Sequence, residues 1–159
     1  LPEFVRGLAR PQLWLSVGTG VFLGVQLFSA PVLGKLSDGY GRRPILILSA
    51  VGTLLANGLL LPVRAGLYFV NRVSDGLTNG MYATMRSAIT DLSPRDELFK
   101  NLGIEGAIIS LAFVLGPMAA GVLLTVLNVP PAQQASYVVG LGVTLAALNV
   151  VLSLLLRET

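Results

Sequence analysis

Charged side chains within an apolar stretch are the residues of this sequence best suited to chemistry. When residues 66–91 are placed on a helix that advances about 100° per residue, polar side chains fall within an arc of roughly 80°. They are Arg72, Asp75, Asn79, Tyr82, Arg86 and Thr90. Inside a membrane, a polar stripe of this kind faces protein or a water-filled cavity and marks a path for ions, protons or a polar ligand.

The pair of Arg72 and Asp75 has more than one interpretation. An ion pair at positions i and i+3 could simply hold helices together, although buried ion pairs are not reliably stabilising. Alternatively, Asp75 could carry a proton or neutralise Arg72, and the sequence leaves these alternatives open. Arg86 lies about one turn from the end of the stretch, so we expect its side chain to reach towards the membrane interface, with Glu105 as a partner.

The composition of the chain indicates that helices in a membrane position these residues. Of the 159 residues, 53% are hydrophobic and 12% are charged, whereas soluble domains have about 25% charged residues. Long uncharged runs, each sufficient to cross about 30 Å of hydrocarbon as a helix, predict an all-α membrane protein. We expect one transmembrane domain over residues 1–159 with five transmembrane helices. Their expected ranges are about 12–34, 44–62, 66–91, 99–127 and 134–156.

Several function classes are disfavoured by what the sequence lacks. The chain has no cysteine, so these residues can form neither a disulfide nor a thiolate nucleophile. It also has no histidine, which is the commonest metal ligand and general base in proteins. We therefore predict neither an enzyme nor a metal site or bound cofactor. The 11 basic residues are spread over the chain without forming a basic helix face, so no nucleic-acid partner is expected.

The distribution of basic residues predicts the orientation of the chain in the bilayer. One set of helix ends holds Lys35, Arg42, Arg43, Arg95, Lys100 and Arg157, and the other holds Arg6, Arg10 and Arg64. Basic residues accumulate on the cytoplasmic side of membrane proteins. We therefore expect the N-terminus outside and the C-terminus in the cytoplasm.

The segment GKLSDGYGRRP, residues 34–44, places charges and glycines between two apolar runs. We expect residues 35–43 to form a tight turn, because glycine permits backbone angles and close approaches that other residues resist. Asp38 could accept hydrogen bonds at the start of the next helix. Arg42 and Arg43 could pair with Asp38 or with the terminus of a neighbouring helix.

This segment resembles the signature loop between helices 2 and 3 of the major facilitator superfamily. The pattern G-x-L-S-D-x-x-G-R-R-x-x-L is formed by Gly34, Leu36, Ser37, Asp38, Gly41, Arg42, Arg43 and Leu46. A basic residue is usual in the family where Gly39 stands. The resemblance implies that Gly34, Asp38, Gly41, Arg42 and Arg43 belong to a gating loop that latches the cytoplasmic ends of the transporter together.

Further motifs resemble the same family in the same order. R-x-x-x-G, from Arg72 to Gly76, resembles a fourth-helix motif linked to proton transfer, with Asp75 in place of the usual Gln. The linker D-L-S-P-R-D-E, residues 91–97, resembles the family's connection between helices 4 and 5, and offers Asp91 as a partner for Arg42 or Arg43.

The string G-P-M-A-A-G, residues 116–121, resembles the fifth-helix motif typical of antiporters, with Ala120 in place of a Gly. Small residues let helix backbones approach closely, and proline kinks a helix. The residues expected to act in packing or kinking are Gly76, Gly80, Gly116, Pro117 and Gly121.

Together, the motifs resemble the proton-coupled drug-efflux branch of the superfamily, which includes tetracycline exporters. The resemblance implies helices 2–6 of the first six-helix half, with the second half absent, in a bacterial inner membrane. It implies an antiporter of small amphipathic molecules that works by alternating access, with protons as the suspected coupling ion at Arg72 and Asp75. Candidate residues for the substrate cavity are Gln26, Asn79, Tyr82 and, more weakly, Asn57.

Alternating access requires two bundles around a midplane site, which five helices cannot enclose. The chain could therefore be part of a transporter, a half-transporter that needs a partner, or a remnant that serves as a structural subunit of a larger membrane complex. Its expected partners are the lipid bilayer, a small-molecule substrate, and the remaining transporter helices or other membrane subunits.

Overall fold

The computed structural model describes residues 9–62 and 64–156, and all the regular structure in these residues is helical. The described helices are α2 (Pro11–Tyr40), α3 (Arg42–Gly58), α4 (Ala65–Thr78), α5 (Met81–Leu92), α6 (Leu98–Val126) and α7 (Gln134–Leu155). This confirms the predicted all-α fold class.

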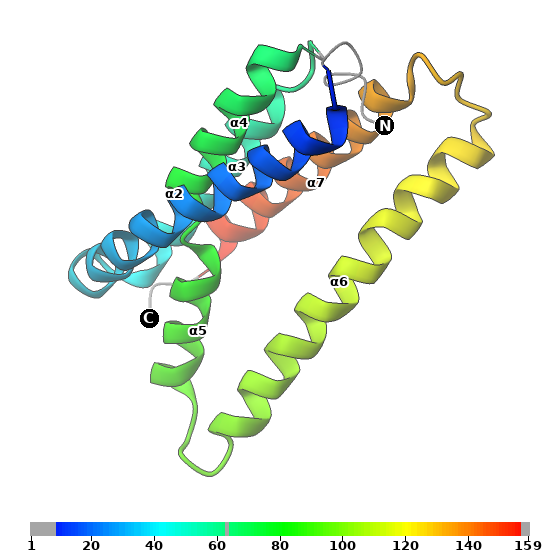
Figure 1. The fold of residues 1–159 in the computed structure, drawn as a ribbon. Coiled ribbons are helices and arrows are strands. Elements are labelled where there is room, and N and C mark those ends of the chain that lie inside the picture. Colours follow the sequence, from blue (N-terminus) through cyan, green and yellow to red (C-terminus); the bar gives the residue numbers. More distant parts are fainter. Residues whose placement is uncertain (1–8, 63, 157–159) are drawn as a thin grey trace.

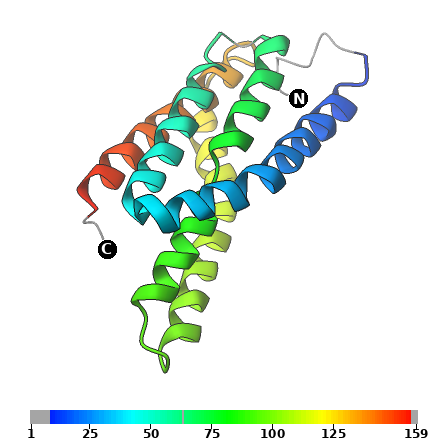
Figure 2. The ribbon, with the colours of Figure 1, turned by 90° about the vertical axis from the view of Figure 1, so that its left-hand side faces the viewer.

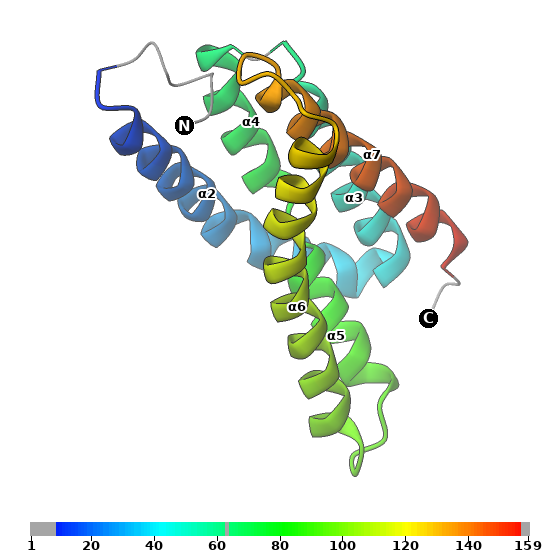
Figure 3. The same cartoon turned by 90° about the vertical axis from the view of Figure 1, so that its right-hand side faces the viewer.

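The helices form a bundle with one projecting pair. α2 packs mainly against α4, and α3 packs against both α7 and α4 (Figure 1). α5 extends beyond this bundle and lies beside the first part of α6 (Figure 2). The rest of α6 runs back past the bundle and contacts α7 only weakly (Figure 3). The bundle is therefore closed around α3 and α4 but open on the side of α6.

Three of the described helices are individually long and apolar enough to cross a membrane. They are Gln12–Tyr40, Leu98–Val126 and Gln134–Leu155. α3 has 17 residues, or about 25 Å at about 1.5 Å per residue, which is slightly less than the hydrocarbon thickness of about 30 Å. Three of the five predicted spanning helices correspond to these long helices, and the other two correspond to the shorter α3 and to the broken pair α4 and α5.

The turn predicted at residues 35–43 is wrong, because α2 continues to Tyr40 and α3 begins at Arg42. Gly41 alone joins the two helices, with φ 95° and ψ 160°. Residues with a side chain rarely adopt this positive φ, whereas glycine does so without a steric penalty. Gly34 and Gly39 lie inside α2, and a Cβ added to either residue would meet only open space. Asp38 also lies within α2 and does not cap α3.

The single helix predicted over residues 66–91 is also wrong, because it breaks at Asn79 and Gly80. The N–H of Gly80 bonds to the carbonyl of Thr78 at 2.9 Å, so the i→i−4 pattern stops there. Asn and Gly are weak helix formers, and Gly80 also gives room to Leu33. Because of the break, Tyr82, Arg86 and Thr90 do not continue the face that carries Arg72 and Asp75.

The glycines expected to permit close packing divide into two groups. A Cβ on Gly76 would lie 2.8 Å from the backbone oxygen of Phe22, and a Cβ on Gly80 would lie 2.6 Å from Cδ1 of Leu33. These two glycines therefore permit the close contact with α2. Gly116 and Gly121 face open space on α6, so the predicted close packing is not found at either position. α6 continues as one helix through Pro117.

Candidate functional site

Arg42 joins two helices through two carboxylates. It is the first residue of α3, and its Nη1 donates to Oδ1 of Asp38 at 2.6 Å, one turn earlier on α2. Nη2 of Arg42 donates to Oδ2 of Asp91, near the end of α5. Nη1 also lies 2.8 Å from the hydroxyl of the buried Ser37. The predicted pairings of Arg42 with Asp38 and Asp91 are confirmed.

Arg43 extends this cluster to a fourth helix. Its Nη2 donates to the carbonyl oxygen of Leu154 at 2.9 Å, in the last turn of α7. The last carbonyls of a helix lack partners within the helix and carry a partial negative charge, so a guanidinium is a favourable partner there. Arg42 and Arg43 together join α2, α3, α5 and α7 at one end of the bundle. We call Asp38, Arg42, Arg43 and Asp91 the charge cluster.

The break between α4 and α5 is stabilised by polar side chains of α2. The hydroxyl of Ser29 donates to the carbonyl of Gly76 at 2.6 Å, and Nε2 of Gln26 donates to the carbonyl of Asn79 at 3.2 Å. Backbone groups freed by a helix break in a membrane must find partners within the protein. Gln26 and Ser29 therefore make the break compatible with a buried position.

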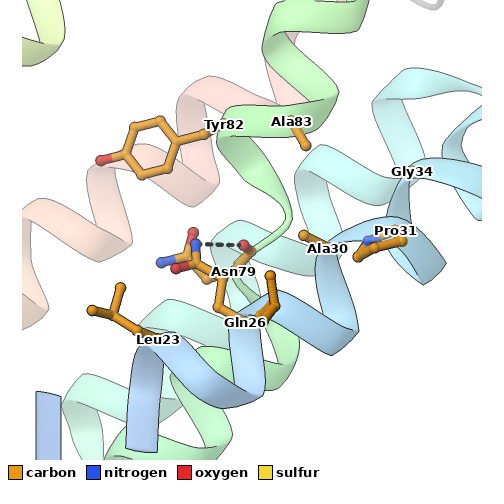
Figure 4. A pocket seen from close by; sticks show the side chains of 9 residues that line it. Leu23, Gln26, Ala30, Pro31, Gly34, Asn79, Tyr82 and Ala83 are labelled. Carbon is orange, nitrogen blue, oxygen red and sulfur yellow. Dashed lines mark hydrogen bonds between the residues drawn. The ribbon is translucent and has the colours of Figure 1, made fainter. Parts of the chain in front are cut away.

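The three main candidate residues for the substrate cavity line a single open pocket of about 620 Å³. Figure 4 shows Gln26 extending to the backbone of Asn79, with Tyr82 on the neighbouring α5. The other lining residues are Leu23, Leu27, Ala30, Pro31, Gly34 and Ala83. The pocket is therefore mostly apolar, with amide and phenol groups as its polar contacts. Asn57 does not line it.

Arg72 and Asp75 do not form an ion pair in the described structure, contrary to one interpretation of the sequence. Nε of Arg72 instead donates to Oδ1 of Asn71 at 2.8 Å. The guanidinium carbon also lies 5.7 Å from the ring centre of Phe22 and 5.5 Å from that of Tyr68. Arg72 is thus held by cation–π contacts and an amide.

Asp75 reaches α3 rather than Arg72. Its Oδ1 accepts a hydrogen bond from the hydroxyl of Thr53 at 3.1 Å. Nearby, the fully buried Asn71 donates to the carbonyl of Ala56 at 2.7 Å. Asp75 therefore lies in the α3–α4 contact with a hydroxyl as its hydrogen-bonding partner.

Arg86 pairs with Glu105, as predicted. Its Nη2 lies 3.1 Å and its Nε 3.2 Å from Oε2 of Glu105, so the pair joins α5 to α6. The Arg86 side chain is 62% exposed, whereas that of Glu105 is 3% exposed. The second oxygen of Glu105, Oε1, is buried without a hydrogen-bonding partner in the described residues.

Sequence reasoning missed Ser29, Thr53 and Asn71, all of which hold the polar interior. Single hydroxyl or amide groups in apolar helices give a weak signal, because serine and threonine also bond to their own helix. It also missed Gly18 and Gly52, where a Cβ would lie 2.4 Å from the ring of Tyr68 and 2.3 Å from the side chain of Thr78. Their importance depends on which helices cross at those positions.

The relatives of the chain include drug-resistance proteins. It is 33% identical over 105 residues to the class H tetracycline resistance protein of Pasteurella multocida, which covers 65% of this chain and 26% of that protein. It is 36% identical over 99 residues to the class B protein of Escherichia coli, covering 61% of this chain and 24% of that protein. Major facilitator superfamily domain-containing protein 10 of Mus musculus is 35% identical over 130 residues, which is 78% of this chain and 28% of that protein.

The chain spans about a quarter of the length of these curated relatives. The match to a protein family is more extensive, because the family described as Major Facilitator Superfamily matches this sequence over residues 8–159. The match covers all the described helices, including the charge cluster and the pocket lined by Gln26, Asn79 and Tyr82. The chain is an integral membrane protein that belongs to the Major Facilitator Superfamily.

Proposed function

We propose that this chain works as part of a proton-coupled exporter of small amphipathic molecules in a bacterial inner membrane, with its N-terminus outside and its C-terminus in the cytoplasm. The observation that carries the proposal is the pairing of Arg42 with both Asp38 and Asp91. Both carboxylates are more than half exposed, and such ion pairs are weak enough to break and re-form during a conformational change. The charge cluster is therefore suited to act as a reversible latch during alternating access.

The pocket supports the substrate class. Its apolar lining with Gln26, Asn79 and Tyr82 suits an amphipathic molecule that needs a few hydrogen bonds. The tetracycline resistance proteins among the relatives agree with this, since export of such a molecule would confer resistance. Membership of the superfamily favours transport over catalysis. Residues from elsewhere in the transporter would complete the open side of the pocket.

Asp75 is the proposed proton carrier. It is an acid on α4 whose nearest polar partner is the neutral hydroxyl of Thr53, which can donate to a carboxylate or accept from a carboxylic acid. The contact therefore tolerates both protonation states. Arg72 bonds to Asn71 rather than to Asp75, so Asp75 is not locked in an ion pair.

The test is transport by the full-length polypeptide in liposomes with an imposed pH gradient. We expect Asp75→Asn to abolish proton-driven export while substrate exchange without a gradient continues, because asparagine cannot release a proton. Asp96→Asn, which removes an exposed carboxylate from the α5–α6 loop, is the matched control and should export normally. Proton-driven export by Asp75→Asn at the normal rate would remove Asp75 from the mechanism.

A structural subunit of a larger membrane complex is the second candidate. The observation that favours it is the exposed apolar surface of α6, where Phe113 is 71% exposed and Val126 is 71% exposed. Under this hypothesis, other membrane subunits purify with the polypeptide and the reconstituted polypeptide transports nothing. Export by the polypeptide alone in liposomes would contradict it.

A further inference from the structure

Arg86 lines a second pocket, which adjoins the pocket lined by Gln26, Asn79 and Tyr82. The second pocket has a volume of about 350 Å³ and is lined by Tyr82, Ala83, Arg86, Ile109 and Phe113. Tyr82 and Ala83 also line the first pocket. The two pockets therefore adjoin along one face of α5, and a ligand that spans them would contact Arg86 at one end and the amides at the other.

Glu105 holds the Arg86 guanidinium in one orientation. Both Nε and Nη2 of Arg86 point to the same oxygen of Glu105. A guanidinium has five N–H donors, and Nε is the one hydrogen-bonded to Glu105, so donors on Nη1 and Nη2 remain for a ligand. Because the Arg86 side chain is 62% exposed, these donors are accessible. Arg86 is thus an oriented donor group rather than a freely moving surface cation.

The charge at the surface of this region is positive. Glu105 balances Arg86 but is buried, with 3% of its side chain exposed. Neither pocket has a carboxylate among its described lining residues. A ligand therefore meets the cation but not its counterion. This arrangement favours a carboxylate, which arginine can bind with two parallel hydrogen bonds, and disfavours an ammonium group.

Two aromatic rings line the same pocket as Arg86. Tyr82 is 47% exposed and Phe113 is 71% exposed, and both line the pocket that contains Arg86. Such rings supply apolar contact area and pack well against another flat ring. A ligand with an aromatic body next to an acidic group would therefore satisfy the rings and Arg86 together.

We propose that Arg86, Tyr82 and Phe113 form a binding subsite for amphipathic aromatic carboxylates. This inference rests on the proposed function, because it names the chemical class of substrate for the same transporter cavity. Arg86 binds the carboxylate, Tyr82 and Phe113 contact the ring, and the buried Glu105 positions Arg86.

The test is equilibrium binding to the full-length polypeptide in detergent, with three probes of the same ring size. The probes are 2-naphthoate, its neutral amide 2-naphthamide, and 2-naphthylmethylammonium. We expect naphthoate to bind about tenfold or more tightly than naphthamide, as is typical of hydrogen bonds to charged groups. The ammonium compound should bind most weakly. Equal binding of naphthoate and naphthamide, tighter binding of the ammonium probe, or no binding of any probe would overturn the proposal.

Variants assign the preference to Arg86. We expect Arg86→Gln to abolish the preference for naphthoate and to leave naphthamide binding nearly unchanged. Arg95→Gln, which removes an exposed positive charge from the α5–α6 loop, should retain the full preference. Arg86→Gln would leave Glu105 buried without its partner, so the double variant Arg86→Gln/Glu105→Gln provides a second measurement if the single variant does not fold. A preference that survives either variant would overturn the proposal.

The binding assay needs no pH gradient, so its outcome is independent of proton coupling. If Asp75→Asn exports normally but the naphthoate preference still depends on Arg86, the proposed coupling fails and the subsite stands. If Asp75→Asn abolishes export but Arg86→Gln keeps the preference for naphthoate, the subsite fails and the proposed function stands.

Discussion

At the scale of single residues, glycines determine how closely α2 and α4 approach. Gly18 on α2 gives room to the ring of Tyr68, and Gly76 on α4 lies against the backbone of Phe22. In membranes, association between helices depends on close packing rather than on a hydrophobic driving force. The contact between α2 and α4 therefore depends on the absence of a side chain at these positions.

Replacing Gly76 with alanine tests this dependence. A Cβ there would lie 2.8 Å from a backbone oxygen, which cannot move away as a flexible side chain can. We expect Gly76→Ala to lower the free energy of unfolding by about 1–3 kcal/mol, which is typical of overpacking. The thermal unfolding midpoint in detergent measures this change.

Gly20→Ala is the control for Gly76→Ala, because Gly20 is also helical but faces open space. Alanine favours a helix over glycine by about 1 kcal/mol, so the control should be neutral or slightly stabilising. Equal midpoints for the two variants would mean that the α2–α4 contact adapts to an added methyl group.

Single-residue predictions from the sequence succeeded where a charge had few possible partners. Because charges are scarce in this chain, the sequence predicts Asp91 as a partner for Arg42 or Arg43 and Glu105 as a partner for Arg86. The structure pairs Asp91 with Arg42, and Arg86 with Glu105. Arg72 and Asp75 were placed on one face, but the sequence could not show that Thr53 on α3 binds Asp75 instead. That contact depends on the crossing of two helices, which local spacing does not encode.

At the scale of secondary-structure elements, the break at Asn79 and Gly80 shapes the pocket. The break lets α5 leave the bundle in a new direction, so Tyr82 lines the same pocket as Gln26 and Asn79 (Figures 1 and 4). It also exposes backbone carbonyls, which Ser29 and Gln26 bind. Polar side chains of α2 thus stabilise an irregular segment between α4 and α5.

Ser29→Ala tests this role. The carbonyl of Gly76 would lose the buried hydrogen bond from the hydroxyl that lies 2.6 Å away. Hydrogen bonds between membrane helices contribute about 0.6–2 kcal/mol, and we expect a loss of this size from the free energy of unfolding. Amide hydrogen exchange should also become faster around residues 76–81.

The matched control for Ser29→Ala is Ser110→Ala. The Ser110 hydroxyl bonds to the carbonyl of Gly106 within its own exposed helix, so no backbone group depends on it. Its removal should change stability by no more than about 0.5 kcal/mol. Faster exchange around residues 76–81 in the control, or no change in Ser29→Ala, would contradict the assigned role.

The sequence predicted long uncharged helices well and their interruptions poorly. The structure has α6 and α7 within one or two residues of the expected ends, because composition changes sharply there. The polar and glycine-containing character of residues 35–43 predicts a turn there, but the chain is helical on both sides of Gly41. The sequence does not reveal the break at Asn79, because polar residues on both sides of it fit a single helical face.

At the scale of the whole molecule, the charge cluster joins α2, α3, α5 and α7 at one end. We predict that Arg42→Gln opens this end without unfolding the protein, because its partners Asp38 and Asp91 are 66% and 59% exposed. Ion pairs with exposed partners contribute little to global stability.

Opening can be measured by the reaction rate of an introduced cysteine with a membrane-impermeant maleimide. The 159 residues contain no natural cysteine, so Ala83→Cys supplies a reporter in the pocket. In inside-out vesicles, the reporter cysteine of Ala83→Cys should react several times faster when Arg42→Gln is also present. With Arg95→Gln, it should react at the same rate as in Ala83→Cys alone. The same slow rate in all three would show that the charge cluster does not control access.

The uneven distribution of charges also bears on how the chain enters the bilayer during synthesis. α6 and α7 are long and apolar, so each can pass from the translocon into lipid without assistance. The segment of α4 and α5 carries Arg72, Asp75 and Arg86 and is broken at its centre, which makes its direct transfer unfavourable. Its polar partners Gln26, Ser29 and Thr53 precede it in the sequence, and of the three charged residues only Arg86 has its partner, Glu105, in a later helix. Helices that are synthesised first therefore provide the surface that receives the segment least able to insert alone.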